Sequence, residues 1–282
     1  MKILTFDIEE WFHILDNQAT RTEAEWEGFE CRIYENMDRI HKILDEKNQK
    51  ATFFCLGWVA RKYPEVLKEI DRRGHEIATH SDLHQLAYEQ SRTEFSQDLE
   101  RSIKSIEDTI GKKVRAYRAP GFSLMNQNKW VFEELLKNGI EIDASIFPAQ
   151  RSHGGFEQFG LAEPCWIDID GMKLKEFPIN LYSVFGKNMI FSGGGYFRLL
   201  PYPVLDYLTK KSNYVMTYFH PRDFDAQQPM VPGLNFIRKF KSYYGLKNCL
   251  PKLEKLTQQH QFVDIRTAEV AVDWENAKVV ML

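Results

Sequence analysis

The chain has 282 residues, of which 43% are hydrophobic and 27% are charged, and its formal net charge is −3. These values exclude a disordered chain, a collagen-like repeat and a coiled coil. The Lys and Arg residues are spread along the chain without a basic block, which argues against a nucleic-acid-binding protein. No apolar run approaches the length of about 18 residues that a membrane-spanning helix needs.

The N-terminal segment MKILTFDIEEWF lacks the long apolar core and the small-residue cleavage site of a signal peptide. It resembles a first strand that runs directly into acidic residues. The four cysteines are far apart and form no CxxC pair; they are Cys31, Cys55, Cys165 and Cys249. Widely spaced cysteines in a chain of this length predict reduced thiols in a cytoplasmic protein.

Short apolar runs alternate with helical patterns along the chain. We expect strands at 2–8, 51–56, 75–79, 114–118, 140–143, 173–178, 214–220 and 261–265. Helices are expected at 32–48, 64–73, 92–110 and 126–138. The helix at 92–110 carries the clearest signals, because Ser91 and Glu94 can form a capping box and Gly111 can end it. This alternation predicts an α/β fold with a mainly parallel sheet, and its seven or eight units suggest a closed barrel.

We expect one domain over residues 1–282, since no linker or internal repeat divides the chain. The stretch of about 149–200 is less regular and contains Gly154-Gly155 and Gly193-Gly194-Gly195. It is expected to be a loop insertion that carries substrate contacts. Residues from about 233 to 282 are expected to form a helical extension at the C-terminus.

Polar side chains gather at the ends of the predicted strands. They are Asp7 and Glu9, His80 and His84, Arg118, Asp143 and His220. In a parallel barrel the C-terminal ends of the strands share one rim, which is where active sites lie. We therefore expect these residues to form a single site, although they are spread over most of the chain.

The segment His80-Ser-Asp-Leu-His84 is the strongest local signal. Two imidazoles four residues apart face the same way on one helical turn, which is a metal-chelating spacing. A carboxylate from elsewhere would complete a His₂–carboxylate metal site with an open position. For this segment alone, a pair of surface histidines is the alternative.

Asp7 and Glu9 are two residues apart on the first strand, so both side chains can point to one face while Ile8 points to the other. One carboxylate could bind a metal while the other takes a proton from water. The alternative is a solvated acidic turn, which fits Glu10 better than Asp7 because Asp7 lies among apolar residues.

Five motifs, in order along residues 1–222, resemble those of the polysaccharide deacetylase family, also called the NodB homology or carbohydrate esterase 4 family. The motifs are TFDIE at 5–9 for TFDDG, HSDLH at 80–84 for H(S/T)xxH, RAPG at 118–121 for RxPY, DASIFP at 143–148 for DxSxxP, and TYFH at 217–220 for a strand that ends in His. GGGYFRLLPY at 193–202 and FHPRDFD at 219–225 resemble the branch found in exopolysaccharide gene clusters.

The resemblance implies a distorted (β/α)₇ TIM-like barrel and metal-dependent hydrolysis of an N-acetyl group on a sugar. It also implies a role for each matching residue. Asp7 is the general base, Arg118 orients that base, His220 is the general acid, Asp143 assists the histidine, and His80 and His84 are metal ligands. The metal is expected to be zinc, although the same ligands accept cobalt, nickel or iron.

Two positions depart from the family pattern. The metal-binding acid of the family directly follows the base, where this chain has Ile8, so we predict that Glu9 is the third protein ligand. Gly121 replaces the usual Tyr, but it keeps the backbone N–H that serves as an oxyanion donor. His153, in a glycine-containing loop, and Tyr196 are further candidates for substrate contact.

The sequence therefore predicts a metal-dependent hydrolase that removes an N-acetyl group from an amino sugar of a bacterial surface polysaccharide or exopolysaccharide, or of its precursor. Its expected partner is an N-acetylated carbohydrate. Two alternatives stay open. One is a metal-independent cyclic-amide hydrolase of the same fold, and the other is a sugar-binding barrel without catalytic activity.

Overall fold

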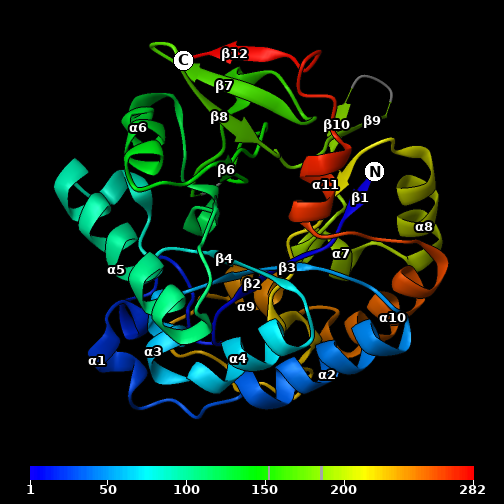
Figure 1. Cartoon of the computed structure of the whole chain (residues 1–282). Coiled ribbons are helices and arrows are strands. Elements are labelled where there is room, and N and C mark those ends of the chain that lie inside the picture. Colours follow the sequence, from blue (N-terminus) through cyan, green and yellow to red (C-terminus); the bar gives the residue numbers. More distant parts are fainter. Residues whose placement is uncertain (152, 185–186) are drawn as a thin grey trace.

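The computed structural model describes residues 1–151, 153–184 and 187–282. Its centre is an eight-stranded sheet in the order β12-β7-β8-β6-β5-β4-β3-β2, with helices packed outside it (Figure 1). Five successive strands pair in parallel: β2 (Thr5–Ile8), β3 (Thr52–Cys55), β4 (Glu76–Thr79), β5 (Ala116–Tyr117) and β6 (Ile142–Asp143). The predicted α/β class with a mainly parallel sheet is confirmed.

The two ends of the sheet are built differently. At one end, β1 (Lys2–Ile3) pairs in parallel with β11 (Val215–Met216), and the backbone N–H of Asp7 donates to the carbonyl of Phe219 at 2.7 Å. At the other end, β8 (Met172–Glu176) pairs with β6, β7 (Cys165–Ile169) lies antiparallel to β8, and β12 (Val279–Met281) lies parallel to β7. In the described part of the chain, β1 and β11 form a two-stranded sheet of their own, which the bridge between Phe6 and Phe219 joins to β2, and the strand pairings do not form the closed ring that the sequence suggests.

The helices follow the predicted order. The longer ones are α2 (Ile33–Glu46), α4 (Pro64–Arg72), α5 (Arg92–Ile110), α6 (Trp130–Lys137), α8 (Tyr202–Lys211), α9 (Phe236–Tyr243) and α10 (Cys249–Gln259). The shorter ones are α1 (Glu23–Trp26), α3 (Gly57–Lys62), α7 (Gly194–Leu199) and α11 (Ile265–Ala271). The capping box of α5 is confirmed, because Ser91 Oγ accepts from the Glu94 N–H while the Glu94 carboxylate accepts from the Ser91 N–H.

Strand β2 has alternating surroundings that orient the acidic residues. Phe6 and Ile8 are fully buried in the main hydrophobic core. Thr5 and Asp7 point the other way and both bond to Arg118. The period of two in a strand therefore holds here, and it turns the carboxylate of Asp7 away from the apolar core.

The less regular stretch contains more structure than the sequence suggests. Besides the β7–β8 pair, it holds the antiparallel pair β9 (Tyr182–Val184) and β10 (Lys187–Met189) and helix α7. Residues 152 and 185–186 of the predicted insertion lie outside the described residues. The C-terminal extension is helical in α9, α10 and α11 but ends in β12, and the predicted strand at 261–265 forms only one bridge, between Val263 and Ile3.

The cysteines are free thiols, and Cys31 is the exposed one of the four. None of the helices in the described part of the chain is long and apolar enough to cross a membrane.

Candidate metal centre and active site

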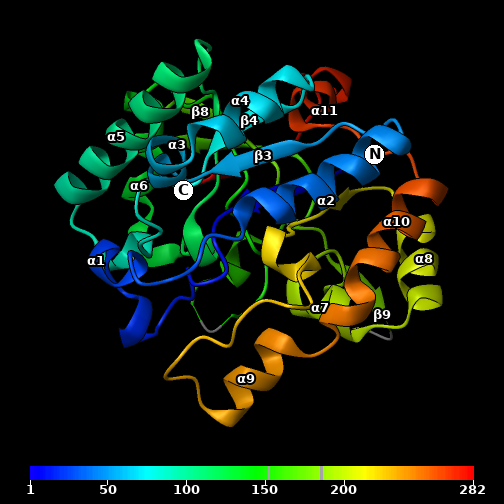
Figure 2. The same cartoon turned by 90° about the horizontal axis from the view of Figure 1, so that it is seen from below.

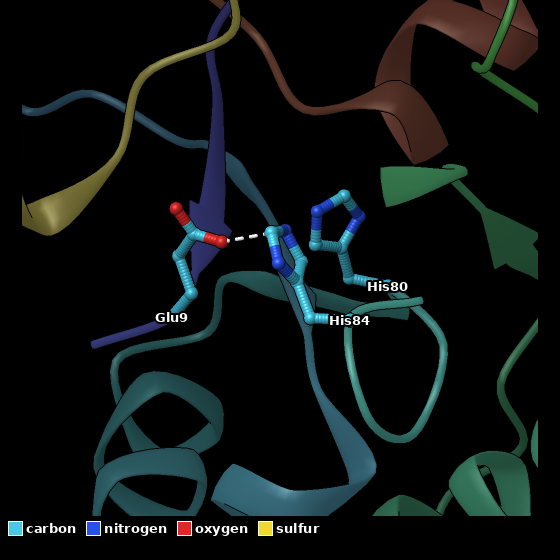
Figure 3. Close-up of side chains that lie close together, drawn as sticks. All are labelled: Glu9, His80 and His84. Carbon is cyan, nitrogen blue, oxygen red and sulfur yellow. Dashed lines mark ion pairs between the residues drawn. The ribbon is translucent and has the colours of Figure 1, made fainter. Parts of the chain in front are cut away.

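Glu9, His80 and His84 meet at one end of the sheet (Figure 3). All three are buried, and their ligand atoms lie within 4.8 Å of one another. His84 Nε2 lies 2.7 Å from Glu9 Oε2. The structure thus brings together the three residues that the sequence suggested as metal ligands.

The loop that carries the two histidines differs from the prediction. A helical turn over 80–84 is wrong, because Ser81 and His84 have φ angles of 70° and 56°, in the left-handed region that L-residues rarely adopt. Within the loop, Ser81 Oγ accepts from the His84 N–H at 3.2 Å. The rings of His80 and His84 still converge, with centroids 5.3 Å apart, because the loop doubles back on itself. Backbone strain of this kind often marks a functional site.

Buried charges hold this loop against two helices. The carboxylate of Asp82 is fully buried and pairs with Arg61 of α3 and Arg101 of α5, each at 2.5 Å. Asp98 of α5 accepts from the Asp82 N–H at 2.9 Å. Gly57 is required for the close approach, since a Cβ there would lie 2.2 Å from Asp82 Oδ1. The loop is therefore fixed in position before any ligand binds.

His80 is prepared to act as a ligand. Its Nδ1 lies 2.8 Å from the carbonyl oxygen of Arg118, so Nδ1 carries the hydrogen and Nε2 has a free lone pair. Burial lowers the pKa of His80 to about 4, so the ring is neutral near pH 7. A metal-binding histidine needs this tautomer and this protonation state.

Glu9 fits the role of a cation ligand. Burial alone would raise its pKa, but the imidazoles of His84, His220 and His13 lower the pKa to about 2. Apart from its contact with His84, Oε2 receives no hydrogen bond from the described residues. A buried, ionised carboxylate without donors is costly unless a cation balances it. The donor set of one carboxylate and two imidazoles therefore fits a divalent metal such as zinc.

Asp7 lies beside this group and is held by one arginine. Arg118, which is fully buried, donates from Nη1 to Asp7 Oδ1 at 2.8 Å and to Thr5 Oγ1 at 2.7 Å. Its Nε donates to the carbonyl of Ala144 at 3.1 Å, and its guanidinium lies 4.1 Å from the ring centre of Phe54. One oxygen of Asp7 is thus fixed by the arginine.

His220 faces the other oxygen of Asp7. His220 Nε2 lies 3.8 Å from Asp7 Oδ2 and 3.9 Å from Glu9 Oε1. Its Nδ1 lies 3.1 Å from Asp223 Oδ2, and Asp223 also pairs with Arg198. Burial would lower the pKa of His220, but Asp223, Glu9 and Asp7 raise it to about 9. The ring therefore carries a proton near pH 7.

The carboxylate that contacts His220 Nδ1 belongs to Asp223, a residue that the sequence analysis did not single out. Asp143, suggested for that assistance, instead accepts from Ser145 Oγ at 2.5 Å. Ser145 Oγ in turn accepts from the N–H of Ala119, next to Arg118. Asp143 is therefore linked through Ser145 to the loop that carries the arginine.

A second acid, Glu176, is paired with Asp143 in the sheet register. Burial and the Asp143 carboxylate raise the pKa of Glu176 well above its usual range, so the two carboxyl groups share a proton. Glu176 also accepts from the N–H of Ile146 at 3.2 Å. The pair stabilises the segment after β6 without a net double charge.

The three residues suggested for substrate contact lie in different surroundings. Gly121 has a φ of 62°, and a Cβ there would lie 2.8 Å from Leu15. His153 packs near Gly121, and its Nδ1 lies 2.8 Å from Asp16 Oδ2. Tyr196 lies on α7 with about half of its side chain exposed. Gly121 and His153 are therefore neighbours, while no described contact joins Tyr196 to them.

A cavity of about 910 Å³ opens beside His84. His13 also lines it, with its ring centre 5.9 Å from that of His84, although the sequence gave no partner pattern for His13. His13 Nδ1 accepts from the Glu10 N–H, and burial lowers its pKa to about 3, so it is a neutral ring with its hydrogen on Nε2. The remaining walls are mostly polar, which suits a hydroxyl-rich ligand.

Two family models cover most of the chain. Residues 26–142 match a model described as polysaccharide deacetylase. Residues 144–269 match a model described as a domain of unknown function, DUF3473. The boundary between the two matches falls just after β6, inside the continuous sheet.

Among curated proteins, the chain is 34% identical over 97 residues to a peptidoglycan-N-acetylglucosamine deacetylase of Bacillus cereus, a match that covers 33% of this chain and 35% of that protein. It is 29% identical over 108 residues to a peptidoglycan deacetylase of Helicobacter pylori, covering 38% of this chain and 36% of that protein. The match thus spans about a third of the length of these relatives.

Solved structures share the fold over nearly the whole chain. A Mycobacterium smegmatis protein assigned as a polysaccharide deacetylase aligns with a TM-score of 0.64 at 18% identity, covering 99% of this chain and 92% of that one. A CE4 family pseudoenzyme from Bacillus anthracis aligns with a TM-score of 0.50 at 15% identity, covering 99% and 66%. Residues 26–142 are therefore similar to the polysaccharide deacetylase family, and the solved structures show that the chain shares the fold of these proteins.

Proposed function

We propose that the protein is a metal-dependent hydrolase that removes an N-acetyl group from an amino sugar. The observation that carries the proposal is the buried group of Glu9, His80 and His84, which lies next to a fixed carboxylate and a protonated histidine. Named deacetylases among the relatives support the same reaction. We further propose that the amino sugar belongs to a bacterial surface polysaccharide or exopolysaccharide, or to its precursor.

Glu9, His80 and His84 would hold the metal. Glu9 would replace the metal-binding acid of the family, because this chain has Ile8 at that position. A bound divalent metal supplies Lewis acidity, which activates water and polarises the acetyl carbonyl. The residues of the chain provide the remaining steps. The Arg118 carbonyl fixes the tautomer of His80, so that its Nε2 faces the ligand group without rearrangement.

Asp7 is suited to act as the general base. Arg118 occupies its Oδ1, so Oδ2 is the oxygen available to accept a proton from the attacking water. His220 is suited to act as the general acid, since Asp223 helps keep it protonated near pH 7. His220 Nε2 would donate its proton to the amine nitrogen as the C–N bond breaks, which leaves acetate and a free amino sugar.

The cavity supports a carbohydrate substrate. A volume of about 910 Å³ accommodates more than one sugar ring. Gly121 lies at a conformation that favours glycine, and its backbone N–H is the proposed oxyanion donor. We also propose His153 and Tyr196 as substrate contacts. The proposed compartment is the cytoplasm.

The test combines metal analysis with an assay of acetate release from N-acetylglucosamine oligomers. The purified protein should contain stoichiometric metal, and a chelator should remove both metal and activity. His80→Ala combined with His84→Ala should abolish both. His260→Ala is the matched control, because His260 is a buried histidine that pairs with Asp206 away from the site.

Each alternative gives a different result in this test. Full metal content in the double variant would contradict the metal assignment. Activity on a cyclic amide that survives chelation would favour the metal-independent hydrolase. Saturable sugar binding by a metal-loaded protein that releases no acetate would favour a sugar-binding protein without catalytic activity.

A further inference from the structure

Helix α9 exposes an apolar stripe to solvent. Phe236 is 83% exposed and Ile237 is 64% exposed, and about half of Phe240 and Tyr244 is exposed as well. None of the residues of α9 is buried. In Figure 2 this helix stands at the lower edge of the molecule, apart from the other helices. Exposed apolar groups in this number on one short helix mark an interaction surface.

The apolar residues share one face of the helix. At about 100° of turn per residue, Phe236, Ile237, Phe240 and Tyr244 fall within roughly one third of the circumference. The rings of Phe240 and Tyr244 pack together, with centroids 4.8 Å apart. The stripe is therefore a continuous ridge. Its shape is convex, since α9 projects from the molecule.

Positive charge flanks this ridge on both sides. By the same angular spacing, Lys239 lies on one side of the apolar face and Lys241 on the other. Both are exposed, and neither forms an ion pair with a described residue. Residues 226–253 contain no Asp or Glu, but they contain five cations: Arg238, Lys239, Lys241, Lys247 and Lys252. The chain as a whole is acidic, so the charge of this segment is local.

We propose that α9 binds the surface of an anionic lipid bilayer. A convex apolar ridge with lysines along both edges can insert its rings between headgroups while the ammonium groups reach lipid phosphates. A nucleic acid would use the cations but not the apolar stripe. The lipid surface is therefore the partner that accounts for both features of α9.

The position of α9 links this surface to the cavity. Arg238 donates to the carbonyls of Leu15 and Asp16, in the loop that forms one wall of the cavity. Arg198 donates to the Lys241 carbonyl and pairs with Asp223, the partner of His220. A membrane bound to α9 would therefore lie next to the candidate active site. The binding itself goes beyond the proposed function and does not depend on catalysis.

Sedimentation of the full chain with vesicles tests the proposal. Vesicles of phosphatidylcholine mixed with phosphatidylglycerol should bind the protein, and added salt should weaken binding. Phe236→Ser with Phe240→Ser should weaken binding about tenfold or more. Lys239→Ser with Lys241→Ser should weaken it about fivefold per lysine and reduce its salt dependence.

Matched controls distinguish binding through α9 from nonspecific adsorption of the protein to vesicles. Val270→Ser removes a side chain that is 86% exposed on α11, and Lys42→Ser with Lys62→Ser removes two exposed lysines of other helices. These variants should bind vesicles like the unmodified protein, and so should Asp7→Asn, which tests catalysis instead.

Three results would overturn the proposal. The first is an unmodified protein that does not bind the mixed vesicles, and the second is α9 variants that bind them as well as the unmodified protein does. The third is a dimer, detected by light scattering, that Phe236→Ser with Phe240→Ser converts to a monomer while vesicle binding is absent. That result would assign the ridge to an interface between two copies of the chain.

Discussion

His220 and Asp223 are three residues apart and are joined twice. The Asp223 carboxylate accepts from the His220 backbone N–H at 3.0 Å and lies 3.1 Å from its ring Nδ1. Arg198 pairs with the other oxygen of the carboxylate. These contacts orient the ring, so that its Nε2 points toward the carboxylates of Asp7 and Glu9.

Asp223→Asn should lower the pKa of His220, because it removes the carboxylate charge that lies beside His220 Nδ1. The general acid must be protonated, so the loss of activity at alkaline pH should begin at a lower pH in this variant than in the unmodified protein. Asp223, Glu9 and Asp7 together raise the pKa of His220 to about 9, so without the Asp223 charge the alkaline limb of kcat/KM should move down by about one unit or more. A pH profile of acetate release measures the shift.

Asp225→Asn is the matched control for this profile. Asp225 is also buried and lies on the same turn, but it pairs with Arg32. Its removal should reduce stability and leave the alkaline limb in place. An unchanged limb in Asp223→Asn would show that Asp223 does not control the protonation of His220.

Glu9→Gln should weaken metal binding by more than about 100-fold, because a direct ligand costs more than the outer partners of metal ligands do. Glu10→Gln is the neighbouring control. The Glu10 carboxylate accepts from the backbone N–H groups of Arg32 and Ile33 at the start of α2. Its substitution should cost about 1 kcal/mol of stability and leave metal affinity unchanged.

Titration of the two purified variants with zinc, followed by calorimetry, separates the two roles. Equal affinities would contradict the assignment of Glu9 and would leave Asp7 as the candidate third ligand.

Asp7→Asn should remove activity and leave the metal bound. The amide cannot accept a proton from water, and loss of a general base costs about 10²–10⁴ in rate. Arg118 can still donate to the amide oxygen, so the fold should be retained. Metal content and acetate release, measured on the same preparation, test the retention of the metal and the loss of activity. Loss of metal would show that the roles of Asp7 and Glu9 are exchanged.

The sequence predicted that Glu9, His80 and His84 lie together, because its signals are local. The period of two in β2 predicted that Glu9, the first residue after the strand, returns to the face of Asp7, and the two histidines lie in a single short segment. The same period predicted that Ile8 points away, and Ile8 is fully buried in the core. The backbone of the histidine loop was not predictable, since its left-handed residues are held by Asp98 and by the buried Asp82 ion pairs.

Other parts of the site depend on tertiary structure. Glu176 meets Asp143 only through the register of β6 and β8, which no local pattern fixes. Asp223 could have been found, because Pro221 begins a short helical turn in which Asp223 caps the backbone of His220. His13 gave no signal, since a single histidine in an aromatic segment is most often a core residue.

A pair of buried histidines far from the metal ligands should make the fold sensitive to acid. His41 of α2 and His75 stack with their ring planes 7° apart, and neither forms a hydrogen bond with the described residues. Burial lowers the pKa of each to about 4. In the unfolded chain both titrate near 6.5, so the unfolded state binds more protons between pH 6.5 and 4, and stability falls as the pH decreases through this window.

His41→Leu should reduce this loss, because leucine fills the site without titrating. Relative to the unmodified protein, the variant should gain up to about 1.4 kcal/mol in the free energy of unfolding for each pH unit between pH 6.5 and 4. Urea unfolding at several pH values between 4 and 7 measures the difference. Ile40→Leu, at a buried position of the same helix, should show no change in pH dependence. Parallel stability curves for His41→Leu and the unmodified protein would mean that His41 is already protonated in the folded state.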